Sequence, residues 1–296
     1  MIFRSCCPLC NDKKFKIIES INSKNKKLFS YLELKYKLGK YLKKKNYIYE
    51  LRLCMSCGTR YQAYVLDEND NNNFYSNQID SKLSLIKQFK KYRKNLSIRK
   101  KTAKLIKNFL DKNSAKNYDV LEVGAGWGIF AYESSHFDLN FTTLEISQER
   151  RNFHKLLDIN TVDSFDTIKK NAIKFDIVYS NQVIEHLSDL KEFIKSCNEA
   201  LEIGGYFIAE YPSFNNFIHY FFNKNNHFNE MKTKALEHLQ LITDKGAKYL
   251  FESFDSFEYI EYFPIRKFGD RLRLIIHFLT PNKYRGKGFV IAKKVK

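Results

Sequence analysis

Residues 119–130 read DVLEVGAGWGIF, and this stretch decides the fold. An apolar run typical of a buried strand leads into Gly124, Gly126 and Gly128, and a helix is expected to begin near the last of them. Glycine adopts positive φ without a steric penalty and lets a ligand approach the main chain closely. The first N–H groups of a helix add a positive dipole end. The stretch therefore predicts a strand, turn and helix that bind a nucleoside-bearing cofactor.

The spacing of the glycines separates two kinds of cofactor site. A nicotinamide-binding fingerprint has its third glycine three residues after the second, but residue 129 is Ile129. With Glu122 two residues before Gly124, the spacing instead resembles the E/D-x-G-x-G-x-G signature of class I S-adenosylmethionine-dependent methyltransferases. For this stretch taken alone, an ordinary tight turn between a strand and a helix is the alternative.

Later segments resemble the same family in the same order. Residues 141–145 predict a second strand that ends at Glu145, where nucleoside-binding α/β folds place an acid for the ribose hydroxyls. Residues 175–187 resemble the family's F-D-x-V…I-E-H-L segment. Residues 190–211 resemble its next helix, an L-x-x-G-G turn that stops this helix, and its fifth strand. The resemblance implies an α/β protein with a Rossmann-like, seven-stranded methyltransferase sheet.

The resemblance also implies which residues contact the cofactor, S-adenosylmethionine. They lie at or after the ends of the expected strands: Glu122, Gly124, Gly126, Gly128, Glu145, Asp163 and Asn181. Among them, Glu122 is expected near the methionine amine and Glu145 at the ribose hydroxyls. Asp163, which follows the expected third strand, is assigned to the adenine amino group.

Two C-x-x-C pairs precede this region, Cys7 with Cys10 and Cys54 with Cys57. Such pairs converge as four-thiolate zinc sites, which are closed and therefore structural. A single pair would also fit a redox motif, and burial of the cysteines as small apolar residues is the remaining alternative. We expect structural Zn²⁺ in a ribbon domain over residues 1–66, with strands and a basic turn between the pairs.

The chain after the ribbon is expected to divide into two parts. Residues 67–112 form a linker and a helical bridge, with the helix over residues 81–110. Residues 113–296 form the methyltransferase domain, with an acceptor-binding insertion around 212–243 whose aromatic, Asn-rich start suits a loop over a pocket.

The C-terminal part is expected to complete the sheet. A helix is predicted over residues 244–254, followed by strands at 257–263 and 288–295 that pair as a hairpin. Residues 266–279 predict an amphipathic helix between these strands.

Residues 236–243, LEHLQLIT, resemble the E-H-L-x-x-F-[ST] segment of bacterial sugar methyltransferases that also bear a zinc knuckle domain. The resemblance implies acid–base work on the acceptor by Glu237 and His238, a task that suits imidazole because its pKa lies near neutrality. A buried or capping role for His238 is the alternative, and His186 is expected in a pocket wall. The implied acceptor is a small sugar-containing molecule, such as a nucleotide-linked sugar or a surface polysaccharide precursor.

The net charge of +18, from 51 Lys and Arg against 33 Asp and Glu, keeps nucleic acid open as an acceptor. An RNA methyltransferase that docks through its zinc ribbon is therefore the alternative, and a non-catalytic binding module is a third possibility. A nucleotide-linked sugar is also anionic and suits a basic pocket equally well. No apolar run approaches the ~20 residues of a membrane span, and the first residues do not resemble a signal peptide. We expect a cytoplasmic enzyme.

Overall fold

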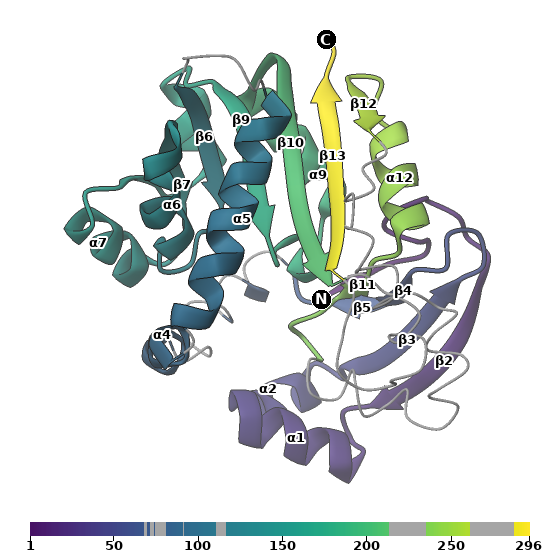
Figure 1. The fold of residues 1–296 in the computed structure, drawn as a ribbon. Coiled ribbons are helices and arrows are strands. Elements are labelled where there is room, and N and C mark those ends of the chain that lie inside the picture. Colours follow the sequence, from purple (N-terminus) through teal and green to yellow (C-terminus); the bar gives the residue numbers. More distant parts are fainter. Residues whose placement is uncertain are drawn as a thin grey trace, which may run out of the picture.

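The computed structural model describes residues 1–67, 70–71, 74, 81–90, 92–110, 117–212, 235–260 and 287–296. This part of the chain forms a large seven-stranded sheet flanked by helices and a small four-stranded sheet beside it (Figure 1). Strands β1 (Ile2–Phe3) and β5 (Tyr64–Val65) form a further antiparallel pair. No helix among the described residues is both long and apolar enough to cross a membrane.

The large sheet has the strand order β12-β13-β10-β9-β6-β7-β8. Strand β13 runs antiparallel to both of its neighbours, and the pairs among β10, β9, β6, β7 and β8 are parallel. The predicted α/β, Rossmann-like, seven-stranded sheet is thereby confirmed. Its strands are β6 (Tyr118–Val123), β7 (Leu139–Leu144), β8 (Asn160–Val162), β9 (Phe175–Asn181), β10 (Leu201–Pro212), β12 (Phe257–Ile260) and β13 (Lys287–Lys294).

Helices cover both faces of the large sheet. Helices α5 (Tyr92–Leu110) and α6 (Ile129–Ser134) share one buried apolar cluster with β6, β7 and β9. Helices α8 (Phe165–Lys170), α9 (Leu190–Ala200) and α12 (Asp244–Glu252) contribute to another. The remaining helical elements near this sheet are α4 (Ser81–Lys90), α7 (Gln148–Leu156), η1 (Ser135–Phe137) and η2 (Ile184–His186).

The prediction that Gly204 and Gly205 end the helix that begins near residue 190 was wrong. Helix α9 already ends at Ala200, and β10 begins at Leu201, which pairs with Phe175. The register then shifts before Tyr206, and Gly204 has a φ of +85° within this irregular stretch. The glycines therefore lie in a bulge of the strand. The bulge needs a positive φ, which glycine adopts readily and other residues rarely do.

The small sheet has the order β11-β4-β3-β2, and all its pairs are antiparallel. Its strands are β2 (Phe15–Asn22), β3 (Ile48–Cys54), β4 (Arg60–Gln62) and β11 (Gln240–Leu241). The edge strand β11 comes from the C-terminal half of the chain. The two parts of the protein also share one apolar cluster, in which Cys57 and Leu9 join Leu250 and Ile242.

The strands and basic turn predicted between the cysteine pairs are present as β2, β3 and a turn at residues 45–46, but the sequence analysis missed two helices. The chain forms helices α1 (Lys26–Tyr36) and α2 (Gly39–Lys44) there. The side chain of Asn25 accepts hydrogen bonds from the backbone N–H groups of Lys27 and Leu28, which caps α1. Leu28, Leu32 and Tyr36 follow at four-residue spacing and are buried.

The small sheet and helices α1 and α2 lie below the large sheet in Figure 1, on the side to which the parallel strands point with their carboxyl ends. The loop expected over residues 213–230 and the amphipathic helix expected over 266–279 lie outside the described residues. The described part of the candidate site therefore comprises the carboxyl edge of the large sheet and its contacts with the small sheet.

Candidate active site

The register of the large sheet brings four of the predicted cofactor residues to one edge. Val123 pairs with Leu144 and with Ser180, and Leu144 pairs with Val162. The next residue along the chain after each of these is a predicted one: Gly124, Glu145, Asp163 and Asn181. In open α/β sheets, ligands bind in the crevice outside the carboxyl ends of the strands.

The glycine turn has the geometry that its sequence predicts. Gly124, Gly126 and Gly128 have φ values of +67°, +60° and +68°. A Cβ atom on Gly124 would lie 2.6 Å from a methyl carbon of Val183, and one on Gly128 would lie 2.7 Å from the ring of His154. A Cβ atom on Gly126 would meet nothing within 4 Å, so this is the side from which a ligand can approach the backbone.

Glu145 is buried and connects the turn to the next helix. Its Oε2 accepts a hydrogen bond of 2.9 Å from the N–H of Gly126, and its Oε1 accepts one of 3.0 Å from the N–H of Ser147. Arg150 lies 3.5 Å from the same carboxylate. A carboxylate offers about four acceptor positions, so Glu145 retains the capacity to accept from two further donors, such as ribose hydroxyls.

His154 supports the turn from beneath and was missed by the sequence analysis. Its Nε2 lies 2.9 Å from the carbonyl oxygen of Gly126, and its Nδ1 lies 2.9 Å from the hydroxyl of Thr143. Burial lowers the pKa of this imidazole, which is therefore neutral near pH 7. A neutral ring that donates through Nε2 to Gly126 and accepts at Nδ1 satisfies both contacts. His154 lies on α7, and no motif distinguishes it there.

Three buried polar atoms near the turn have no hydrogen-bond partner among the described residues. They are Oε2 of Glu122, Nε1 of Trp127 and Oγ of Ser180. Burial, reinforced by the charge of Glu145, raises the pKa of Glu122 to about 8. A buried polar atom without a partner costs free energy that a polar ligand would recover. The turn, Glu145 and these atoms therefore fit the nucleoside and amino acid ends of S-adenosylmethionine.

Replacing Glu122 with Gln should stabilise the cofactor-free protein at high pH. Because the folded pKa of about 8 lies above the ordinary value of 4.5, the folded state retains a proton that the unfolded state releases, and stability falls as pH rises between the two values. The neutral amide avoids this loss. The free energy of unfolding should exceed that of the wild type by on the order of 4 kcal/mol at pH 8 and by little near pH 4. Thermal unfolding at several pH values checks this, and a pH-independent difference would contradict it.

Asp163 and Asn181 occupy the two sides of this edge. Oδ1 of Asp163 accepts hydrogen bonds from the hydroxyls of Thr167 and Ser164, at 2.7 and 3.1 Å, and these bonds lower the pKa of this exposed carboxylate. Asn181 is half-buried and pairs in register with Glu210 on β10.

Glu210 is a further buried carboxylate at this edge, and the sequence analysis missed it. Its Oε1 accepts hydrogen bonds from the hydroxyls of Tyr179, at 2.9 Å, and Thr102, at 3.3 Å. Its backbone oxygen accepts one from the N–H of Gln182, which has a φ of +58°. These contacts tie helix α5 and the end of β9 to β10.

The segment that contains Glu237 and His238 is held between the two sheets. The side chain of Gln62 donates to the backbone oxygen of His238 at 2.9 Å, and the N–H of Gln62 donates to that of Leu239 at 2.8 Å. On the other side, the N–H of Leu239 donates to the backbone oxygen of Glu185 at 2.8 Å. The preceding Leu236 has a φ of +72°, which a branched residue rarely adopts and which the surrounding contacts must enforce.

The two candidate catalytic side chains lie in different surroundings. Glu237 accepts a hydrogen bond of 2.7 Å from the hydroxyl of Tyr36 and forms an ion pair of 2.7 Å with Lys35, both on helix α1. His238 is 5% exposed, and the centroid of its ring lies 4.7 Å from that of His186. The structure thus brings His238 to the turn that follows β9.

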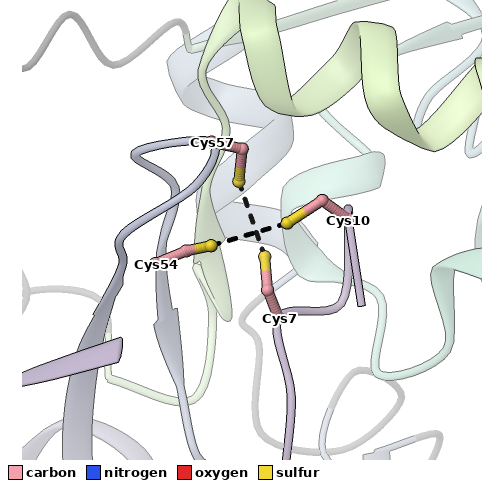
Figure 2. A group of neighbouring side chains, drawn as sticks. All are labelled: Cys7, Cys10, Cys54 and Cys57. Atoms are coloured by element: carbon pink, nitrogen blue, oxygen red, sulfur yellow. Dashed lines mark hydrogen bonds between the residues drawn. The ribbon is translucent and has the colours of Figure 1, made fainter. Parts of the chain in front are cut away.

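The four predicted metal ligands converge, as Figure 2 shows. The sulfur atoms of Cys7 and Cys57 are 3.6 Å apart, and those of Cys10 and Cys54 are 3.5 Å apart. A tetrahedral zinc ion with bonds of about 2.3 Å places its sulfur ligands roughly 3.8 Å apart. The contact between Cys7 and Cys57 lowers the pKa of the Cys57 thiol and raises that of Cys7, and a bound zinc ion would hold all four sulfurs as thiolates. The four cysteines fit a zinc site.

Comparison with known proteins shows the family. The model of a family described as "Methyltransferase domain" matches residues 90–260, and the chain belongs to this family. The chain is 27% identical over 97 residues, or 29% of its length, to the mitochondrial ubiquinone biosynthesis O-methyltransferase of Rattus norvegicus. It is 23% identical over 202 residues, or 64% of its length, to the malonyl-[acyl-carrier protein] O-methyltransferase of Calditerrivibrio nitroreducens. The matches cover 28% and 66% of these two relatives, so the chain spans less than two thirds of either.

Solved structures show the same fold. The plantazolicin methyltransferase BpumL, in complex with SAH, superimposes with a TM-score of 0.53 at 13% identity, over 76% of this chain and 93% of that one.

Proposed function

We propose that the protein transfers the methyl group of S-adenosylmethionine to a small sugar-containing acceptor, such as a nucleotide-linked sugar or a surface polysaccharide precursor. One observation carries the proposal. Val183 packs against the glycine turn, and Glu185 and His186, two and three residues later, contact the segment of His238. A candidate cofactor site and a candidate acid–base residue therefore adjoin at the carboxyl edge of one sheet.

In this reaction, different residues of the chain would bind the cofactor and remove the acceptor proton. When bound, the cofactor supplies a methyl group on a positively charged sulfur. The glycine turn admits it, Glu145 accepts from the ribose hydroxyls, and Glu122 lies at the methionine amine. Asp163, after β8, binds towards the adenine amino group, and Asn181 lines the other side of the same edge at the end of β9. His238, with Glu237, assists the loss of the acceptor proton, and the fixed geometry of the edge aligns the acceptor with the methyl group.

The surroundings of Glu237 favour a ring-shaped anionic acceptor. Lys35 lies 4.7 Å from the ring centroid of Tyr36 and 5.6 Å from that of Tyr31. The ring of Phe74 packs against Tyr36 with a centroid distance of 5.1 Å. Tyr36 and Phe74 are buried in the core around α1. An acceptor would therefore meet the exposed Lys35 and the partly buried Tyr31. A lysine complements a nucleotide phosphate.

We also propose that the four cysteines hold a structural zinc ion. A closed four-thiolate site has no open coordination position for a substrate. The ion would stabilise the small sheet and the segment that this sheet shares with His238.

The direct test uses purified protein, methyl-labelled S-adenosylmethionine and a cell extract. Label in small anionic metabolites is the expected result. Label in RNA would instead support the alternative in which the net charge of +18 binds nucleic acid. Absence of label from every fraction, with the cofactor bound, would contradict an enzymatic role.

Glu145→Ala should weaken cofactor binding. The change removes a charge-assisted hydrogen-bond acceptor for the ribose, and it also removes the acceptor of the Gly126 N–H. A loss of about 1 to 3 kcal/mol, or roughly a 5- to 150-fold rise in Kd, is expected. Calorimetric titration with S-adenosylmethionine measures this. The matched control is Glu202→Ala, an exposed glutamate in the bulge of β10, and an unchanged Kd for Glu145→Ala would exclude the ribose role.

A further inference from the structure

Three side chains from two distant segments form a second group with metal-binding character. Glu185 and His186 follow β9, and His238 lies just before β11 in the segment that Gln62 of the small sheet holds. One carboxylate oxygen and one nitrogen of each imidazole lie within 4.8 Å of one another. The side chain of Glu185 is 1% exposed and that of His186 is 21% exposed. We call these three residues the His–Glu cluster.

The spacing inside the His–Glu cluster suits two ligands of one ion better than a direct hydrogen bond. The Nε2 of His186 lies 3.6 Å from Oε1 of Glu185. An N–H···O hydrogen bond is shorter, about 2.7 to 3.2 Å. Two donor atoms that share a tetrahedral ion, each at about 2.1 Å, are roughly 3.4 Å apart. The observed distance is therefore close to that of two ligands around a common cation.

A hydrogen bond from Nδ1 of His186 fixes the orientation of the ring and therefore of Nε2. The Nδ1 atom donates this bond, of 2.6 Å, to the backbone oxygen of Glu237. The neutral ring then carries its lone pair on Nε2, which faces Glu185. Metal-binding imidazoles are commonly held in this way, because a carbonyl that accepts from the other nitrogen sets the tautomer and the ring orientation. The backbone bond from Leu239 to Glu185 locks the two segments of the His–Glu cluster together.

We propose that Glu185, His186 and His238 bind a divalent cation and leave at least one coordination position open for an acceptor oxygen. Two imidazoles and one carboxylate are the ligand set of open catalytic zinc sites and also suit Mn²⁺ and Fe²⁺. The site differs from the four cysteines, whose thiolates surround their ion completely. A cation would also stabilise the buried carboxylate of Glu185.

The catalytic consequence rests on the proposed function, whereas cation binding does not. The His–Glu cluster starts two residues after Val183, which packs against the glycine turn. A cation there would hold the acceptor oxygen beside the cofactor edge and lower the pKa of its hydroxyl. As a ligand of the ion, His238 would then promote loss of the acceptor proton to solvent through the cation, without accepting the proton itself.

Titration with Mn²⁺ tests the site. Full-length protein is first dialysed to one zinc per chain, the amount that four thiolates hold, and Mn²⁺ binding is followed through the paramagnetic resonance of the free ion. Mn²⁺ prefers nitrogen and oxygen ligands over thiolates, so one further ion per chain is expected. Glu185→Gln and His186→Gln, which preserve side-chain size, should each weaken binding 10-fold or more. His136→Gln, which alters an exposed histidine on η1, should not.

The outcomes separate the two proposals. Absence of Mn²⁺ binding to the wild type, or equal binding by all variants, overturns the cation site, and the wild-type titration decides this even where a variant fails to fold. Mn²⁺ binding without methyl transfer in any extract fraction leaves the cation site and overturns the proposed function. Methyl transfer at full rate by protein whose cluster binds no cation leaves His238 to act directly on the acceptor proton.

Discussion

His238→Gln is expected to lower kcat for methyl transfer by roughly 10²- to 10⁴-fold, the usual contribution of a positioned acid–base group. The Kd for S-adenosylmethionine should remain unchanged, because the glycine turn and Glu145 contact each other and not His238. Steady-state kinetics with the labelled cofactor and calorimetric titration measure the two quantities. The contrast between them distinguishes a role in the reaction from a role in cofactor binding.

Two comparisons sharpen this experiment. His136→Gln alters an exposed histidine and should keep full activity and stability, so it controls for the loss of any imidazole. Glu237→Gln separates the two candidate groups, because the Glu237 carboxylate contacts Tyr36 and Lys35 on α1, whereas the His238 ring lies beside His186. An undiminished kcat for His238→Gln, with thermal unfolding intact, would exclude His238 from the reaction.

The arrangement of the proposed cofactor residues at one edge of the large sheet was predictable, because each of them depends on neighbouring residues in the sequence. The strand, the three glycines and the helix start are contiguous in residues 119–130, and each requires only its neighbours to adopt its conformation. Glu145 and Asp163 directly follow their strands, so the parallel register carries them to the same edge as Gly124. Nothing beyond strand order was needed to bring these residues together.

The surroundings of His238, where we propose that the acceptor binds, were not predictable, because they depend on contacts between distant segments. His238 meets His186 across more than fifty residues, and β11 joins a sheet whose other strands all precede Val65. Two residues are too few to show the alternation that marks a strand. His154 was missed for a similar reason, since its partner Gly126 lies on another element. In contrast, the Asn25 cap and the buried face of α1 were readable in the sequence and were overlooked.

Cys57→Ser is expected to release the proposed zinc ion and to lower the free energy of unfolding by several kcal/mol. Structural zinc sites contribute apparent binding free energies of about 10 to 16 kcal/mol in small zinc-finger peptides, and the loss of one thiolate removes much of that coupling. Metal analysis and chemical unfolding measure the two effects. The matched control is Cys6→Ser, which alters a thiol outside the four and should retain one zinc per chain.

The same variant should also lose activity, because the four cysteines connect to the segment of His238 through a short series of contacts. The backbone oxygen of Cys57 accepts a 2.6 Å hydrogen bond from the hydroxyl of Thr243, which in turn accepts from the N–H of Gly246 at the start of α12. Two strands of the small sheet meet at Gln62, which holds the backbone of His238. Loss of the proposed zinc ion should therefore displace His238 and leave Glu145 in place. We expect kcat to fall while the Kd for S-adenosylmethionine stays constant. Full activity after complete loss of zinc would show that the small sheet maintains the acceptor edge without the metal.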